Sequence, residues 1–457
     1  MNTRDSGSRW TRSANARSLR RIGPRARRHG RHGDFRRRRF LGRFRVTRYP
    51  TCRHCGTPMT LTLIDLGLSA VANSYVPLAR AAEPEPKYPL HVRVCETCWL
   101  VQLDQDVPAG QIFTADYAYF SSFSESWLAH ARRYAETMIG RLDLGRDDLV
   151  IEIASNDGYL LKNFVAAGVP VLGVEPSASV AAAAEAAGVP TLVEFFGEAL
   201  ARRLRDEGRR PALVCSANVL AHVPDINDFV AGIATLLSGE AIYTVEFPHL
   251  LRLIDEVQFD TIYHEHYSYL SLLAVERIFA AQGLRVFEVE EWPTHGGSLR
   301  VFACLAGAHH AEGPGLARVR AAEAAAGLDR AEGYRGFAER AEAVRRGLLD
   351  FLAEVRGQGR MVAAYGAAAK GNTLLNFCGI GPDLVAYCVD RNPAKQKTLL
   401  PGSRIPVFDV GELRRRRPDF VLILPWNLKD EVIGQLADLR AGGTRFVTAV
   451  PMIRVTA

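Results

Sequence analysis

The sequence predicts an α/β protein in which two doubly wound, mostly parallel sheets follow a small cysteine-rich domain. Apolar runs alternate with helical stretches from about residue 125 to 310 and again after residue 360, as βαβ units do. Two C-x-x-C pairs precede these units, and 457 residues are too many for one hydrophobic core. We therefore expect an extension over 1–48, a metal-binding domain over 49–108, a central α/β domain over 109–310, and connecting helices with a second α/β domain over 311–457.

The first 50 residues differ in composition from the rest of the chain. They contain 17 Arg, no Lys and two acids, so self-repulsion and the scarcity of apolar residues predict disorder. The remaining residues carry 40 basic and 48 acidic side chains, and this acidic body argues against a nucleic-acid partner. We interpret residues 1–48 as an upstream extension, with a transit peptide or a nucleic-acid arm as the alternatives.

The overall composition is typical of a soluble globular protein, with 48% hydrophobic and 23% charged residues. No apolar run is long enough to span a bilayer, and no secretory signal is recognisable. We expect a cytoplasmic protein without a membrane partner, either a monomer or a weak homo-oligomer.

Four cysteines, Cys52, Cys55, Cys95 and Cys98, form two C-x-x-C pairs. Each pair can place two thiolates on one metal ion, and two pairs complete a tetrahedral zinc site. A disulfide fits poorly with a cytoplasmic protein. Because four thiolates leave no open position for a substrate, we expect a structural Zn²⁺ ion.

Three segments of the central region read as strand, turn and helix, beginning at DLVIEIASNDG, VPVLGVEPSAS and LVCSANVLAHV. Ligands of doubly wound sheets bind beyond the carboxyl ends of the strands. Glu152 precedes the first turn, and Glu175 ends the second strand near the spacing of a ribose-binding acid. The first turn has one glycine where a dinucleotide fingerprint needs three, so a nucleoside without phosphates, such as S-adenosylmethionine, fits better. The predicted cofactor-binding residues are Glu152, Ala154, Asn156, Asp157, Gly158, Glu175 and Asn218.

Eight segments of the chain resemble one family, the S-adenosylmethionine-dependent C-methyltransferases that act on nucleotide-linked deoxysugars, typically TDP-activated 4-keto hexoses. The segments are CRHCG, CETCWLVQL, DYAYFSSFS, EIASNDGYLL, ANVLAHVPD, YHEHYSYL, THGGSLR and YGAAAKGNTLLN. The resemblance covers almost everything except the Arg-rich extension. It implies a class I methyltransferase fold for the central domain, a Rossmann-like C-terminal domain, and active-site positions for Tyr263, Glu265 and His266. Ala154 departs from the glycine that many methyltransferases carry there.

The stretch YHEHYSY has the residue types of an acid/base centre. A zincin pair is excluded, because Ser268 stands four residues after His264, where the second histidine would be needed. Methylation of a sugar carbon needs a carbanion, which a neighbouring 4-keto group makes accessible as an enolate, and histidine has a suitable pKa for the base. We predict His266 as this base, supported by Glu265, with Tyr263 donating to the enolate oxygen or holding a sugar hydroxyl. A polar surface loop is the alternative.

Further substrate contacts follow from the same resemblance. His222, after the fourth strand of the central domain, matches a catalytic position, although it could also only pack there, and Tyr117 matches a sugar-contacting tyrosine. The turn THGGSLR holds a second candidate for the base, His295, and two glycines that allow a ligand to approach closely. Its predicted substrate-binding residues are His295, Gly296, Ser298 and Arg300, and a plain hairpin turn is the alternative.

The second α/β domain begins with MVAAYGAAAKGNTLLNFC, a strand, a glycine turn and a helix. The N-terminus of this helix would favour a phosphate, and Lys370 adds a positive charge. Lys370 precedes Gly371, so the Walker spacing is absent and we do not expect ATP hydrolysis. We assign Lys370 and Asn372 to the nucleotide diphosphate of the sugar, and a turn with only a folding role is the alternative.

These features predict an enzyme that C-methylates a TDP-4-keto-deoxyhexose, with C3 favoured over C5, to make a deoxysugar for a glycosylated natural product. One alternative is an NAD-dependent nucleotide-sugar dehydrogenase or epimerase, which would need a three-glycine fingerprint that neither α/β unit has. The other is a non-enzymatic zinc-ribbon protein that binds nucleic acid, which the acidic body disfavours.

Overall fold

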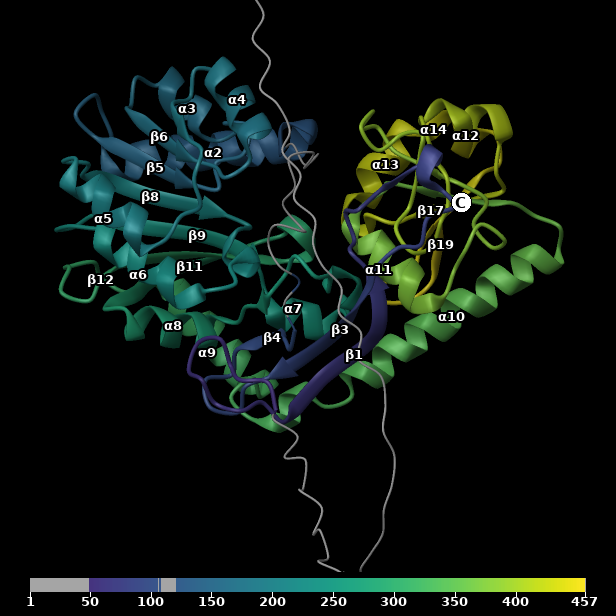
Figure 1. The fold of residues 1–457 in the computed structure, drawn as a ribbon, viewed down its shortest axis with the longest axis horizontal. Helices are drawn as coiled ribbons and strands as arrows, with labels where there is room; N and C mark the ends of the chain where they lie inside the picture. The colour runs from purple at the N-terminus through teal and green to yellow at the C-terminus, as the bar shows by residue number, and fades with distance from the viewer. Residues whose placement is uncertain (1–48, 106, 108–120, 457) are drawn as a thin grey trace, which may run out of the picture. The chain divides into compact units, whose positions relative to one another are not determined.

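The computed structural model describes residues 49–105, 107 and 121–456 of the chain. Tyr117 and the predicted extension lie outside the described residues. None of the helices in the described ranges is both long and apolar enough to cross a membrane. The strands of these ranges form three larger sheets and one two-stranded ladder (Figure 1).

The N-terminal sheet has the order β1-β3-β4-β10 and is antiparallel throughout. Its strands are β1 (Leu61–Ala70), β3 (Lys87–Val94), β4 (Val101–Leu103) and β10 (Ser268–Tyr269). Leu90, Val92 and Val94 are buried at every second position of β3, the alternation of a half-buried strand. The fourth strand, β10, is supplied by the YHEHYSY stretch, far along the chain from the other three.

The central sheet has the order β11-β12-β9-β8-β5-β6-β7. Its strands are β5 (Leu149–Ile153), β6 (Val171–Val174), β7 (Thr191–Leu192), β8 (Pro211–Ala217), β9 (Ile242–Pro248), β11 (Leu284–Trp292) and β12 (Ser298–Leu305). The strands from β9 to β7 are parallel, and β11 and β12 extend the sheet as an antiparallel hairpin. The strand order reverses between β5 and β8, so the turns after these two strands meet at one edge of the sheet.

Helices cover both faces of the central sheet (Figure 1). Residues of α2, α3 and α4 share a hydrophobic core with one face, and residues of α5, α6 and α8 with the other. The helices of this region are α2 (Glu125–Leu142), α3 (Leu161–Ala166), α4 (Ala178–Ala186), α5 (Glu198–Asp206), α6 (Ile226–Leu236), α7 (Leu250–Asp255), α8 (Leu272–Ala281) and α9 (Pro314–Ala326). Because both faces are covered, β5 and β9 are buried along almost their whole length.

The C-terminal sheet has the order β16-β14-β13-β17-β18-β19, and only β19 is antiparallel to its neighbour. Its strands are β13 (Val362–Tyr365), β14 (Cys388–Val389), β16 (Val407–Phe408), β17 (Phe420–Ile423), β18 (Arg445–Thr448) and β19 (Arg454–Thr456). The order reverses between β13 and β17. The helices are α10 (Phe337–Gly357), α11 (Ala369–Cys378), α12 (Gly411–Arg416), α13 (Lys429–Gln435) and α14 (Ala437–Ala441).

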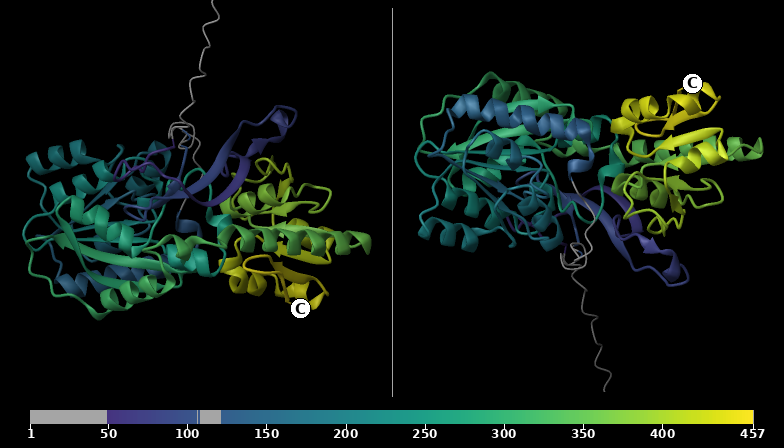
Figure 2. Two further views of the ribbon diagram at one scale, coloured as in Figure 1. Left: turned by 90° about the horizontal axis from the view of Figure 1, so that it is seen from below. Right: turned by 90° about the horizontal axis from the view of Figure 1, so that it is seen from above.

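The N-terminal and C-terminal sheets are joined through packing and through a short ladder. The β1–β3 hairpin, purple in Figure 2, shares one hydrophobic core with α10 and α11. In addition, β2 (Val76–Pro77) pairs with β15 (Thr398–Leu399). The predicted fold class, two doubly wound α/β units after a cysteine-rich domain, is confirmed.

Candidate active site

The loop after β5 has a backbone conformation that glycine adopts more easily than other residues. Ala154, Asn156 and Gly158 have φ angles of 57°, 50° and 74°, in the left-handed region. Asn156 also anchors the segment before α2, because its Oδ1 accepts a hydrogen bond from the Ser121 N–H at 2.9 Å. Non-glycine residues held at such angles are typical of ligand sites, where the surrounding structure supports the strain.

Glu175 follows β6 and lies against this loop. Its Oε2 accepts a hydrogen bond from the Asn156 N–H at 3.2 Å, and its Oε1 accepts one from the Ser177 N–H at 2.9 Å. The side chain is buried, and burial raises the pKa of Glu175 despite these two donors. A carboxylate fixed in this way at a strand end has lone pairs left for both hydroxyls of a ribose.

Two acceptor atoms near these strand ends have no hydrogen-bond partner among the described residues. They are Oδ1 of Asp157 and Oδ1 of Asn218. The carboxylate of Glu152 is buried beside them, with the Tyr159 hydroxyl as a donor. Burial raises the pKa of Glu152 well above its usual range, an effect that the nearby Tyr159 hydroxyl opposes. Buried acceptors without donors are costly unless a ligand supplies the donors. The ammonium group and ribose hydroxyls of S-adenosylmethionine are such donors, so these residues fit that cofactor.

Replacing Glu175 by alanine is expected to weaken the binding of S-adenosylmethionine by about 10- to 100-fold, because a hydrogen bond to a charged acceptor contributes about 1.5–3 kcal/mol. Isothermal titration calorimetry measures this change. The matched control is Glu185→Ala, an exposed residue on α4 of the same βα unit, which should keep the wild-type affinity. Equal affinities of the two variants would contradict the ribose-binding role.

His266 lies in a cluster of imidazole and phenol rings. Its Nδ1 is 2.8 Å from the carbonyl oxygen of Thr261, and because a carbonyl can only accept, Nδ1 carries the proton. The lone pair is therefore on Nε2, the nitrogen that can take a proton from a substrate. The ring centroids of Tyr263 and His222 lie 3.9 Å and 4.6 Å from that of His266.

The surroundings keep the histidines of this cluster neutral. Burial lowers the pKa of His266 well below its usual value, and the neighbouring His222, His295 and Lys370 lower it further. Burial likewise lowers the pKa of His222 to about 4 and that of His295 to about 4, with Lys370 contributing to the second shift. A neutral imidazole is the form that can act as a base.

These neutral histidines make the stability of the fold depend on pH. The unfolded chain binds protons at histidine below about pH 6.5, whereas His222 and His295 of the folded chain bind them only near pH 4. Their contribution is therefore complete above pH 6.5 and is lost as the pH falls toward 4, on the order of 3 kcal/mol for each histidine. Urea titrations at a series of pH values measure this fall. A His222→Gln variant should lose part of the dependence, and an unchanged slope would contradict the shift.

The carboxylate of Glu265 is turned away from its sequence neighbour His266. Both of its oxygens accept hydrogen bonds from Nδ2 of Asn73, at 2.9 Å and 2.7 Å. Burial raises the pKa of Glu265 to about 7, against the effects of Asn73 and Lys395. Successive side chains of this segment point in different directions, so the Thr261 carbonyl takes the place expected for Glu265 as the partner of the base. Glu265 instead joins the YHEHYSY stretch to the segment after β1.

The tip of the β11–β12 hairpin carries His295 toward the end of β8. His295 has a φ angle of 55°, and its Nε2 lies 3.1 Å from Nδ2 of Asn218, the residue that follows β8. Gly296 has a φ angle of 93°, which a side chain would strain. The Ser298 hydroxyl donates to the Thr294 carbonyl at 2.9 Å, so it stabilises the hairpin turn itself.

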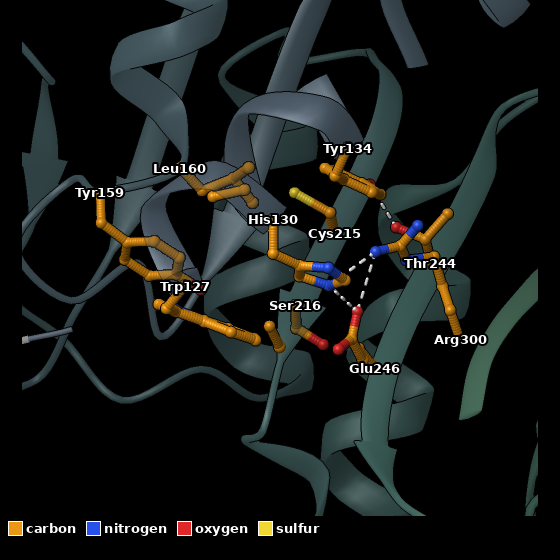
Figure 3. Close-up of a pocket in the computed structure, with 12 residues that line it drawn as sticks. Trp127, His130, Tyr134, Tyr159, Leu160, Cys215, Ser216, Thr244, Glu246 and Arg300 are labelled. Carbon is orange, nitrogen blue, oxygen red and sulfur yellow. Dashed lines mark hydrogen bonds and ion pairs between the residues drawn. The ribbon is translucent and has the colours of Figure 1, made fainter. Parts of the chain in front are cut away.

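Arg300 lies on β12, close to this hairpin tip, in a buried ionic network (Figure 3). Its Nη2 is 2.9 Å from Oε2 of Glu246, and Nε2 of His130 is 2.8 Å from the same oxygen. Burial would raise the pKa of Glu246, but the His130 contact and the Arg300 charge lower it to about 2. The other Glu246 oxygen accepts the Thr294 hydroxyl at 2.8 Å. Arg300 is only 4% exposed and its charge is paired with that of Glu246, so it stabilises the hairpin of which it is part. Its contact with a substrate stays a prediction.

A small cavity lies beside this network (Figure 3). Its volume is about 20 Å³, enough for about one water molecule. The lining residues are Trp127, His130, Ala131, Tyr134, Tyr159, Leu160, Cys215, Ser216, Ala217, Thr244, Glu246 and Arg300. The cavity thus lies between α2 and the ends of β8 and β9, next to the residues that follow the cofactor loop.

The C-terminal domain contributes Lys370, whose charge acts on His266 and His295. Its Nζ donates to Oδ1 of Asn427 at 2.7 Å and lies 4.6 Å from the centre of the Trp426 ring. Asn372, by contrast, is buried and donates to the carbonyl of Ala72 at 2.7 Å. The side chain of Asn372 therefore links α11 to the N-terminal domain, and its contact with the diphosphate stays a prediction.

The four cysteines come together as the sequence predicts. All four sulfur atoms lie within 4.8 Å of one another, and the pairs Cys52–Cys98 and Cys55–Cys95 are 3.5 Å apart. Nε2 of Gln102 in β4 donates to Sγ of Cys52 at 3.1 Å. Four converging thiols with such a supporting donor fit a closed, structural Zn²⁺ site.

Several residues that build the active site give no signal in the sequence. Asn73 bonds a carboxylate 192 positions away, and the contact between His130 and Glu246 spans 116 positions. Asp260 and Thr261 are different, because they directly precede the YHEHYSY stretch. Extending the polar stretch by three residues toward the N-terminus would have included both.

Family models match three consecutive parts of the chain. A "Putative zinc binding domain" matches residues 52–113, a methyltransferase domain matches residues 127–289, and a C-methyltransferase C-terminal domain matches residues 293–451. The predicted zinc-binding region and methyltransferase class are confirmed.

Two solved methyltransferase structures align with part of the chain at low similarity. One is a magnesium protoporphyrin IX methyltransferase from Synechocystis PCC 6803 with bound S-adenosylmethionine, at 15% identity and a TM-score of 0.29, covering 39% of this chain and 81% of that chain. The other is an S-adenosylmethionine-dependent methyltransferase from Clostridium acetobutylicum, at 9% identity and a TM-score of 0.32, covering 38% of this chain and 91% of that chain. Similarity at this level does not inform the chemistry of this chain.

A curated relative is similar over almost its whole length. It is the C-methyltransferase NovU of Streptomyces niveus, which is 35% identical over 404 residues, covering 88% of this chain and 96% of the relative. Together with the three family models, this similarity shows that the chain belongs to the C-methyltransferase family and is an S-adenosylmethionine-dependent enzyme of that family.

Proposed function

We propose that this enzyme methylates the carbon beside the ketone of a nucleotide-linked 4-keto-deoxysugar, with TDP as the nucleotide and C3 as the methylated carbon. The observation that carries the proposal is the His266 imidazole, whose proton is held on Nδ1 by the Thr261 carbonyl. This leaves Nε2 as a base among other imidazoles and phenols. A base of this strength cannot remove a proton from an ordinary sugar carbon, but an adjacent ketone makes the proton acidic enough.

In the proposed reaction, Nε2 of His266 takes the proton from the carbon next to the ketone, and the electron pair of the broken bond forms an enolate. Tyr263, whose ring lies against His266, would donate its hydroxyl to the enolate oxygen or to a sugar hydroxyl. His222 would fix the position of the His266 ring from its edge. S-adenosylmethionine, held by Glu175 and residues 154–158, supplies an electrophilic methyl group when bound.

The nucleotide half of the substrate is assigned to the C-terminal domain. The turn at residues 366–368 follows β13 at the point where the strand order of this sheet reverses, the usual ligand position in such sheets. The first N–H groups of α11, which begins directly after this turn, would favour a phosphate. We place the enzyme in the cytoplasmic synthesis of a deoxysugar for a glycosylated natural product.

The test is incubation of the zinc-loaded enzyme with labelled S-adenosylmethionine and a panel of TDP-4-keto sugars. We expect label on C3 of at least one of them, located by NMR. The matched 4-hydroxy sugars should remain unlabelled, because their carbon-bound protons are not acidified. The absence of transfer to every 4-keto sugar, from protein that binds S-adenosylmethionine, would overturn the proposal. Label on C5 would overturn only the assignment of the carbon.

A further inference from the structure

Lys370 occupies the ligand position of the C-terminal sheet. It lies in the first turn of α11, which follows β13, and its Nζ donates to Oδ1 of Asn427 at 2.7 Å. Asn427 and Trp426 follow β17, the strand on the other side of the reversal in strand order. The ammonium group lies 4.6 Å from the centre of the Trp426 ring, within the range of a cation–π contact.

Trp426 joins this ammonium group to the central domain. Its indole Nε1 donates to Oδ2 of Asp260 at 2.7 Å. The far edge of the ring packs against Gly296, where an added Cβ would overlap it. Asp260 directly precedes Thr261, whose carbonyl fixes His266, and Gly296 directly follows His295. Trp426 therefore contacts both backbone segments that position the candidate bases.

The charge of Lys370 reaches the histidine cluster. It lowers the pKa of His266 and that of His295, and it opposes the effect of burial on the pKa of Asp260, which rises to about 6. Burial lowers the pKa of Lys370 itself, an effect that Asp260 opposes. A partly buried ammonium group beside neutral imidazoles stabilises an anion that forms next to it more strongly than it would in water.

We propose that Lys370 is a catalytic residue whose ammonium group stabilises the enolate oxygen, and that Asp260 and Trp426 position it. This inference rests on the proposed function. When the C–H bond breaks, its proton goes to Nε2 of His266 and its electron pair forms the carbon–carbon double bond, which leaves the ketone oxygen negatively charged beside Lys370. When the new carbon–carbon bond forms, the electron pair of the double bond would bond the methyl carbon, and a lone pair of the oxygen would re-form the ketone. The methyl–sulfur bond would break with its electron pair left on the sulfur, so that S-adenosylhomocysteine leaves.

The experiment compares Lys370→Met and Lys370→Arg with the wild type in three measurements: deuterium exchange at the sugar α-carbon in D₂O, methyl transfer at saturating substrate, and the binding of TDP. We expect Lys370→Met to lower exchange and transfer together by about 10²- to 10³-fold, the usual effect of removing one stabilising group. The affinity for TDP should change less than about threefold, and Lys370→Arg should recover part of the exchange rate.

The control variant is Lys429→Met in the same domain, because the Lys429 side chain makes no hydrogen bond or ion pair in the described ranges. This variant should match the wild type in all three measurements.

If Lys370→Met binds TDP at least tenfold more weakly and recovers its rate at saturating substrate, Lys370 holds the diphosphate and the inference is wrong. Wild-type exchange in Lys370→Met would also overturn it. Should Lys370→Met fail to fold, Trp426→Phe, which keeps a smaller aromatic ring and loses the bond to Asp260, should lower exchange without weakening TDP binding. A wild type that neither exchanges nor methylates any 4-keto sugar would instead refute the proposed function.

Discussion

Replacement of His266 by glutamine is expected to lower two rates, that of methyl transfer and that of exchange of the sugar α-proton with solvent, by about 10²- to 10⁴-fold. The glutamine amide reaches the position of Nε2, but its nitrogen is not basic, so the base is lost while a side chain of similar reach is kept. The Thr261 carbonyl, which receives the Nδ1 proton of His266 at 2.8 Å, loses this donor in the variant. Deuterium incorporation into a TDP-4-keto sugar in D₂O, measured with and without S-adenosylmethionine, separates proton removal from methyl transfer.

The matched control is His264→Gln in the same stretch. The Nε2 of His264 lies 3.3 Å from the Tyr88 carbonyl, so this ring is turned to the N-terminal sheet and not to the cluster. The variant should exchange the α-proton at the wild-type rate even if its melting temperature falls. Exchange that persists in His266→Gln would show that the base is elsewhere, and His222 and His295 would be tested next.

Removal of zinc is expected to lower the melting temperature sharply and to abolish α-proton exchange as well. Structural zinc sites of small domains contribute on the order of 10 kcal/mol to folding. The second effect follows from the N-terminal sheet, in which Gln102 donates to Sγ of Cys52 and pairs along the backbone with Ser268 of β10. Ser268 is only two positions after His266, so loss of the metal releases the segment that carries the base.

The measurements are metal content, thermal unfolding and deuterium exchange for Cys95→Ser and for chelator-treated enzyme. We expect one zinc ion per chain in the wild type and none in the variant. Cys304→Ser is the control, because Cys304 is buried in β12 and is not one of the four converging thiols, so it should keep zinc and exchange. Full exchange in zinc-free enzyme would rule out the link between the metal site and His266.

The sequence predicts the two α/β units correctly because their strands are short, continuous apolar runs between helical stretches, a pattern that local residues determine. The cysteine site is predictable for a similar reason, since each pair lies in one short turn. β10 has no such pattern. A strand of two residues within a polar stretch carries no periodicity, and it forms only because β4 offers a free edge.

The direction of individual side chains is not predictable, because it depends on partners that are distant in the chain. Glu265 faces Asn73 and not His266, although His266 is its sequence neighbour. The charge of Arg300 is neutralised by Glu246, so its place in a glycine-rich turn is no guide to substrate binding. Trp426 and Asp260 meet across 166 positions, a pairing that a single sequence cannot reveal.

The contacts of the N-terminal domain also determine when in its synthesis the chain can finish folding. The zinc ligands are synthesised early, but β4 can pair with β10 only after residue 269 has been made. The Ala72 carbonyl accepts from the side-chain amide of Asn372, which is 300 positions later in the chain. The partner of β2, β15, is synthesised later still. Such long-range pairing slows folding and leaves edges exposed in the meantime. The domain that is translated first is therefore the last to form all of its contacts. A chain truncated before α11 would hold the four zinc-binding cysteines in a domain that lacks these contacts and is prone to aggregate.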